Sequence, residues 1–203
     1  MTTLKKIINK IVIIGIMIGE WCSKTWSNIR WRKHRDDVPL DSADLKGPLA
    51  IKDYAAWTIA KVYSFFKYKP DGLSELGDSF RPAPYAYSLL CQARKGEIKA
   101  FEDDCDGFAG CVLHMLVKNG IDACIVSIIS SVNSYGHAVV GYKDEDGAMH
   151  ILDYLTDYKG KTIEHILKKH YMNPTGGKFV VAFKRWNYGE KKWTLDKKHI
   201  FFE

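Results

Sequence analysis

The sequence predicts an α+β domain in which helices come first and an antiparallel sheet follows. Apolar residues recur at helical spacing over much of residues 49–118, whereas residues 121–184 contain short β-branched runs separated by turn signals. The chain has 203 residues, enough for one sizeable core and short for two. Apolar residues make up 46% and charged residues 27%, which argues against general disorder.

Residues 1–35 form a separate segment that combines apolar and basic residues. Three lysines at positions 5, 6 and 10 precede an apolar run over residues 11–19. This run is too short to span a bilayer comfortably, because a spanning helix needs about 20 apolar residues. Its size and flanks are typical of the apolar region of a signal peptide, although no A-x-A cleavage site follows.

A helix in this segment is a further interpretation. It would bury Ile7, Ile11, Ile14 and Ile18 against a partner or a membrane surface, and three tryptophans at positions 21, 26 and 31 suit a headgroup layer. We expect residues 5–21 to serve as an anchor, an uncleaved signal or a partner-binding helix; an ordinary buried helix is the alternative. The protein is then membrane-associated or exported, and otherwise cytoplasmic or part of a larger assembly.

The polar stretch 36–48 (DDVPLDSADLKGP) is predicted to link this segment to a globular domain over residues 49–203. Helices are expected over residues 49–67 and 85–94, separated by a loop over residues 71–84 that contains glycines and prolines.

Cys105 is predicted to lie at the start of the next helix. The apolar stripe of this helix consists of residues 108, 111, 112, 115 and 116, and Asn119-Gly120 is a typical helix end. Aspartates at positions 103, 104 and 106 suit a helix N-terminus, where carboxylates are favoured. His114 lies off the stripe and is expected to be exposed.

Strands are expected over residues 121–130, 137–142 and 149–154, and the last two should form a hairpin through KDEDG. If His137 stands opposite Asp153, Tyr142 pairs with Ala148 and residues 143–147 form the loop. His137 and Asp153 would then be cross-strand neighbours on one face. A helix over residues 162–170, a strand over 178–184 and a strand near Trp193 or Ile200 complete the chain.

The five cysteines, at positions 22, 91, 105, 111 and 124, do not suggest a disulfide framework, because their number is odd and their spacing irregular. No C-x-x-C pair occurs, and Cys105, Cys111 and His114 fit no structural zinc pattern. Cys111 and Cys124 are expected to be buried apolar residues, and Cys22 and Cys91 to be structural.

Cys105 differs from the other cysteines because its position favours chemistry. A thiol becomes a good nucleophile as a thiolate, which a helix N-terminus and a neighbouring imidazolium both stabilise. A helix-start cysteine, a strand histidine and an aspartate on the next strand together match a catalytic triad. Each residue alone has an ordinary structural explanation: an inert thiol, a surface histidine, an aspartate that caps a strand.

Three motifs in this region are DDCDGFAGCVLHMLVKNGI, GHAVVGY and GAMHILDY. They resemble the G-D-C-D-D-[FY]-A, G-H-A-V-L and L-D-N motifs of the transglutaminase-like superfamily, and are nearest to the bacterial transglutaminase-like cysteine proteinases. The resemblance covers about a quarter of the chain. It implies a papain-like core, with N-terminal helices packed on an antiparallel sheet, and a triad of Cys105 as nucleophile, His137 as base and Asp153 as orienting residue.

The sequence departs from this pattern after the cysteine. Gly107 replaces the second aspartate, and Phe108 stands where some relatives have a further acidic calcium ligand. Asp104 and Asp106 match two such calcium-binding positions, so calcium is a hypothesis that the resemblance raises, although no cofactor is required. The resemblance also implies an oxyanion donor at the Cys105 backbone N–H, and Gln92 is a candidate second donor by its chemistry alone.

We therefore expect acyl transfer through a Cys105 thioester, most simply by a cysteine protease or amidase that acts on a protein or peptide. A transglutaminase that crosslinks or deamidates proteins, and a non-catalytic structural or binding module on the same fold, are the alternatives. The formal charge of +6 is a mild basic excess that we expect to be spread along the chain. It permits contact with nucleic acid or anionic lipid without requiring either, and no specific nucleic-acid partner is predicted.

Overall fold

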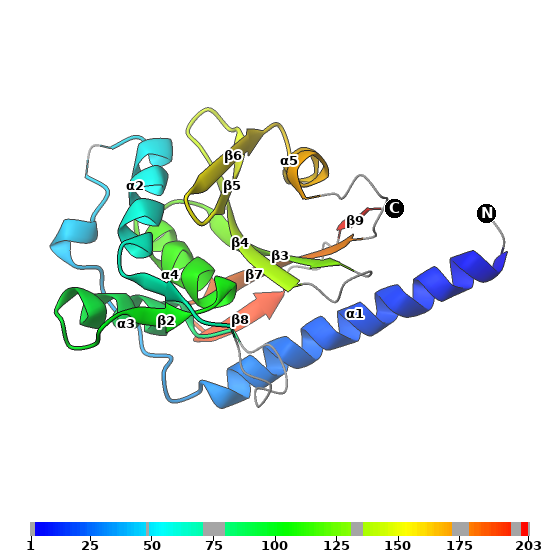
Figure 1. Cartoon of the computed structure of the whole chain (residues 1–203), viewed down its shortest axis with the longest axis horizontal. Helices are drawn as coiled ribbons and strands as arrows, with labels where there is room; N and C mark the ends of the chain where they lie inside the picture. Colours follow the sequence, from blue (N-terminus) through cyan, green and yellow to red (C-terminus); the bar gives the residue numbers. More distant parts are fainter. Residues whose placement is uncertain are drawn as a thin grey trace.

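The computed structural model describes residues 3–47, 49–70, 80–130, 136–171, 179–195 and 200–202 (Figure 1). Residues 71–79 of the expected loop and Pro48 of the expected linker lie outside these ranges. The fold is α+β, as the sequence predicts, with its large antiparallel sheet formed by the second half of the chain. The order of elements therefore follows the change from helical to alternating apolar spacing.

Five α-helices are described. They are α1 (Thr3–Arg30), α2 (Ile51–Tyr63), α3 (Ala83–Arg94), α4 (Cys105–Lys118) and α5 (Ile163–His170). Among the described residues, no helix is both long enough and apolar enough to cross a membrane. Helix α4 begins at Cys105, and its C-cap is Asn119, followed by Gly120 with a φ of 77°. Both ends of α4 are therefore where the local sequence predicts them.

The strands are β1 (Phe66–Tyr68), β2 (Phe101–Asp103), β3 (Ala123–Ser130), β4 (Gly136–Lys143), β5 (Met149–Asp153), β6 (Thr156–Gly160), β7 (Phe179–Asn187), β8 (Lys192–Leu195) and β9 (Ile200–Phe202). Strands β1 and β2 form a small parallel sheet that the sequence did not predict. The large sheet has the order β6-β5-β4-β3-β7-β8, and β9 also pairs with β7.

The large sheet is covered on both faces, which gives the domain two apolar clusters. One cluster joins α2, α3 and α4 to sheet residues such as Ile125 and Val140. The other joins α5 to the alternate residues of the same strands, such as Val126 and Val139. Figure 1 shows α5 on the opposite side of the sheet from α4. The alternation of strand side chains thus places α4, and Cys105 at its start, against one defined face.

The stretch expected to be a linker is packed against the domain at Asp44, whose side chain is fully buried. Its carboxylate contacts Lys61, accepts a hydrogen bond from Tyr87 Oη at 2.5 Å and pairs with Arg94 Nη1 at 2.6 Å. Burial raises the pKa of Asp44, but these three partners outweigh burial and hold it below its usual value. Residues 36–47 are therefore fixed through a buried charge, which their polar composition did not predict.

His114 is fully buried, contrary to the expectation that it is exposed. Its Nε2 lies 2.8 Å from the Val38 carbonyl oxygen, its Nδ1 lies 2.8 Å from Tyr188 Oη, and Tyr87 stacks on the ring. The prediction was wrong because α4 is enclosed on more than its apolar stripe: every residue from Asp106 to Leu116 is buried.

Candidate active site

Cys105 is the first residue of α4, and Asp104 is its N-cap. The Asp104 Oδ1 atom accepts a hydrogen bond from the Asp106 N–H at 3.1 Å, which satisfies one of the free donors of the first turn. The thiol therefore lies at the positive end of a 14-residue helix. Such a position favours the thiolate over the neutral thiol.

A backbone donor from β4 also reaches the Cys105 sulfur. The Ala138 N–H donates a hydrogen bond to Sγ, with a nitrogen-to-sulfur distance of 3.4 Å. The described pairing of β4 with β5 extends no further than Val140 and Leu152, so Ala138 lies beyond the end of the β4–β5 ladder, although it still pairs with Ser127 of β3. Its N–H therefore serves the thiol, and this contact brings the residue after His137 against Cys105.

His137 and Asp153 form the second part of the site. His137 Nε2 lies 2.8 Å from Asp153 Oδ1, and the His137 side chain is 10% exposed. The sequence predicted that these residues meet across the hairpin, and the structure brings them together.

The predicted hairpin register was wrong by two residues. Tyr142 pairs with His150 rather than Ala148, and Lys143 pairs with Met149, so the loop is 144–148 rather than 143–147. Asp144 determines this turn, because its carbonyl accepts from the Gly147 N–H at 3.1 Å and its Oδ1 accepts from the Ala148 N–H at 2.7 Å. His137 and Asp153 are consequently diagonal neighbours instead of direct partners, and still share a face because a shift of two preserves alternation.

Two tyrosines that sequence reasoning missed support this pair. Tyr171, at the end of α5, donates its hydroxyl to Asp153 Oδ2 at 2.8 Å, so each oxygen of Asp153 has a partner. Tyr154 follows Asp153 with a φ of 47°, a conformation that is uncommon for a residue with a side chain. Its ring lies 5.0 Å from Phe108 and 6.0 Å from His137, measured between centroids, and so packs beside the imidazole.

Cys105, His137 and Asp153 line one pocket of about 660 Å³. Its other described lining residues are largely apolar: Tyr63, Phe66, Tyr68, Gly136, Tyr154, Leu155 and Thr156. A smaller pocket of about 340 Å³ includes Cys124 but no histidine among its described lining residues. Of these two pockets, the larger is therefore the one whose described lining combines a cysteine with a histidine.

The other described cysteines lack this environment. Burial raises the pKa of the Cys91 thiol and raises that of Cys111 far above its usual value, so both thiols are held protonated. Cys124 is buried and Cys22 is exposed on α1. Among the described cysteines, Cys105 is therefore the one that combines partial exposure and a helix N-terminus with a pocket that it shares with His137 and Asp153.

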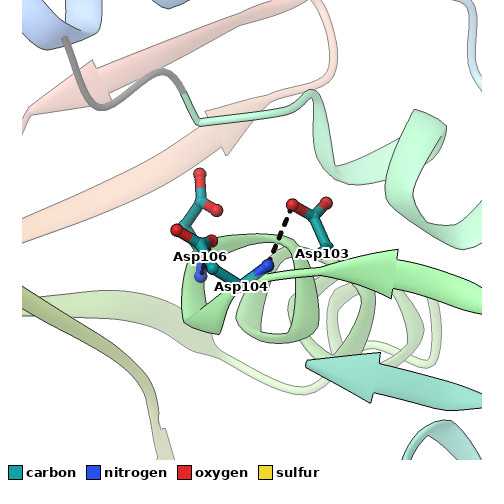
Figure 2. Close-up of side chains that lie close together, drawn as sticks. All are labelled: Asp103, Asp104 and Asp106. Atoms are coloured by element: carbon teal, nitrogen blue, oxygen red, sulfur yellow. Dashed lines mark hydrogen bonds between the residues drawn. The ribbon is translucent and has the colours of Figure 1, made fainter. Parts of the chain in front are cut away.

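Three aspartates surround the first turn of α4, and Figure 2 shows how their carboxylates are oriented. Asp103 Oδ1 accepts from the Asp104 N–H at 3.0 Å, and Asp103 Oδ2 lies 2.5 Å from Arg81 Nε. Burial raises the pKa of Asp103 to about 6, although Arg81 opposes the rise. Asp103 and Asp104 thus have protein partners, Arg81 and the helix N-terminus, which account for their positions without a cation.

Gly107 is required by the position of Asp103. A Cβ atom at residue 107 would lie 1.9 Å from Asp103 Oδ2, a distance that no side chain tolerates. Glycine at this position therefore has a local reason: the carboxylate that pairs with Arg81 occupies the space that a side chain at residue 107 would need.

Gln92 lies half-buried on α3 and is not among the described residues that line the Cys105 pocket. The structure therefore does not bring this candidate oxyanion donor into the site. Gln92 was predicted from the chemistry of its side chain alone, and no spacing in the sequence indicated that it lies near Cys105.

Comparison with known proteins adds no assignment. The sequence matches no protein-family model, and no curated protein matches it significantly. The function must therefore be inferred from the geometry of the pocket and the chemistry of its residues.

Proposed function

We propose that the protein is a thiol-dependent acyl-transfer enzyme, a cysteine protease or amidase with a transglutaminase-like, papain-related core. The contact that carries this proposal is the 2.8 Å bond from His137 Nε2 to Asp153 Oδ1, in the pocket that also holds Cys105. A carboxylate that fixes an imidazole beside a helix-start thiol is the arrangement that nucleophilic catalysis by cysteine needs.

Each residue has one role in the proposed reaction. Asp153 accepts the Nε2 proton of His137, so Nδ1 is the ring nitrogen that takes the Cys105 proton. The thiolate then adds to the carbonyl carbon of an amide, and the imidazolium returns the proton to the leaving amine as the C–N bond breaks. Water, deprotonated by His137, hydrolyses the resulting thioester and releases the acid.

The developing oxyanion needs donors near the sulfur. The Cys105 backbone N–H, at the start of α4, is the candidate that the family resemblance implies. Calcium has no part in these steps. Asp104 and Asp106 remain the residues that would contact such an ion, and the proposed reaction does not require it.

A peptide-like probe with an electrophilic ketone tests the proposal. We expect the probe to label Cys105 much faster than Cys22, although Cys22 is the more exposed thiol. His137→Ala should slow labelling at Cys105 and leave the rate at Cys22 unchanged. Mass spectrometry after digestion measures both rates in one sample. The labelling rate at Cys91, which is half-buried as Cys105 is, serves as the control for partial burial. Equal rates at Cys105 and Cys22 would overturn the proposal.

Turnover distinguishes water from amine as the acceptor. Wild type and Cys105→Ala are compared on casein, with and without a fluorescent primary amine. New casein fragments that depend on Cys105 indicate proteolysis, whereas Cys105-dependent incorporation of the amine indicates a transglutaminase. Absence of both, together with unselective labelling, favours the non-catalytic module.

A further inference from the structure

The basic excess of the chain is concentrated in residues 1–35 and is not spread along it as we expected. This segment contains eight lysines and arginines and one acidic residue, Glu20, so its formal charge is +7. The whole chain has a formal charge of +6, and residues 36–203 therefore carry −1 in total. The charge belongs to α1 and the few residues that follow it, and the domain with the Cys105 pocket is close to neutral.

Helix α1 also carries an exposed apolar stripe. Its described members are Ile11, Ile14, Ile18, Trp21, Trp26 and Ile29, which are between 46% and 63% exposed. At about 100° per residue, all six lie within an arc of about 140° around the helix axis. A stripe of this length on one helix is more than the scattered apolar exposure of an ordinary surface.

The C-terminal end of α1 is fixed to the domain. Asn28 and Trp193 of β8 are joined by two hydrogen bonds: the Trp193 N–H donates to Asn28 Oδ1 at 3.0 Å, and Asn28 Nδ2 donates to the Trp193 carbonyl at 3.3 Å. The Trp31 ring packs 5.6 Å from that of Tyr85 and so belongs to the domain contact. Figure 1 shows the N-terminal part of α1 extending away from the sheet, toward the end marked N.

We propose that α1 lies along the surface of an anionic lipid bilayer, with the stripe in the headgroup–acyl boundary and the basic residues among the headgroups. Tryptophan and isoleucine on one face, with lysine and arginine in excess, are the composition of an interfacial helix. Such a helix gains affinity from anionic lipid in proportion to its positive charge. The bonds between Asn28 and Trp193 would then hold the domain at the membrane, independently of what the Cys105 pocket does.

The charge argues against a second copy of this chain as the occupant of the stripe. Residues 1–35 carry +7 in each copy, and α1 itself carries +4, so two such segments packed together would repel one another. An anionic surface has the opposite sign, and it accepts tryptophan at its interface. A groove on another protein is the remaining occupant, and the experiment separates it from lipid.

Co-sedimentation with vesicles tests the proposal on the full chain. One vesicle preparation contains equal parts of phosphatidylglycerol and phosphatidylcholine, and the other contains phosphatidylcholine alone. We expect binding to the anionic vesicles that is at least about tenfold tighter than to the neutral ones and that weakens as salt is added.

The variant Ile14→Glu/Ile18→Glu interrupts the stripe. Its matched control, Leu45→Glu/Leu49→Glu, makes the same charge change at two exposed apolar residues outside α1. We expect the first variant to lose vesicle binding by at least about tenfold and the second to lose little, with unchanged circular dichroism in both. Lys24→Gln/Arg32→Gln/Lys33→Gln should weaken binding to the anionic vesicles alone.

Three results would overturn the proposal. The first is equal binding to both vesicle types. The second is an equal loss of vesicle binding in Ile14→Glu/Ile18→Glu and in its control. The third is a wild-type chain that does not bind vesicles but forms oligomers, which Ile14→Glu/Ile18→Glu dissociates. The last result would make α1 a protein-binding helix.

Discussion

Replacing His114 with glutamine should make the free energy of unfolding less sensitive to acidification. Burial lowers the pKa of His114 from 6.5 to about 4, assisted by Lys118 and opposed by the Val38 carbonyl and Asp37. Because the folded state favours the neutral imidazole, its contribution is present above about pH 6.5 and is lost as the pH falls toward 4. The difference between these two pKa values corresponds to about 3 kcal/mol of unfolding free energy.

Urea unfolding at about pH 7 and about pH 4 measures this effect. The wild type should lose about 3 kcal/mol more than His114→Gln over this interval. The variant also loses the stacking of Tyr87 on the ring, so the change between the two pH values is the informative quantity rather than stability at either one. His165→Gln, at an exposed histidine on α5, is the control and should behave as wild type. If wild type and His114→Gln lose equal stability, His114 is not held neutral by burial.

Four further predictions concern the site and its support. Tyr171→Phe removes one hydrogen bond to Asp153, which is worth about 1.5–3 kcal/mol to a charged acceptor, and should lower the rate of Cys105 labelling about tenfold. Tyr158→Phe, at a ring that packs against Tyr171, should leave the rate unchanged. Gly107→Ala should lower the free energy of unfolding in urea by about 1–3 kcal/mol, because the new Cβ meets Asp103. Gly110→Ala, whose Cβ has its nearest contact at 3.7 Å, should leave the free energy of unfolding unchanged or raise it. Equal effects of the two substitutions would mean that Asp103 moves freely. Asp44→Asn should destabilise by about 3–5 kcal/mol, since it leaves Arg94 and Lys61 without their buried partner, and Asp41→Asn, at a side chain 49% exposed, should cost little. Added calcium should leave the melting temperature unchanged because Asp103 and Asp104 already have protein partners, and a rise that Asp104→Asn abolishes would show that the acidic cluster binds the ion.

The sequence by itself determined the elements whose causes are local. Asp104 and Asn119-Gly120 mark the two ends of α4, so Cys105 is placed at a helix start without knowledge of the rest of the chain. The alternation along β4 and β5 places His137 and Asp153 on one face, and this parity survives a register error of two residues. The meeting of the histidine and the aspartate was therefore predictable, although the hairpin pairing itself was not.

Only the tertiary structure decided which side chains complete the site. Tyr171 reaches Asp153 from the end of α5, and Arg81 reaches Asp103 from the segment before α3; neither contact leaves a periodic signal in the sequence. His114 is buried because Val38 and Tyr188, 76 and 74 residues away, close over the side of α4 that its apolar stripe leaves uncovered. Local sequence predicts which face of an element is apolar, but what covers its other faces depends on how distant segments pack together.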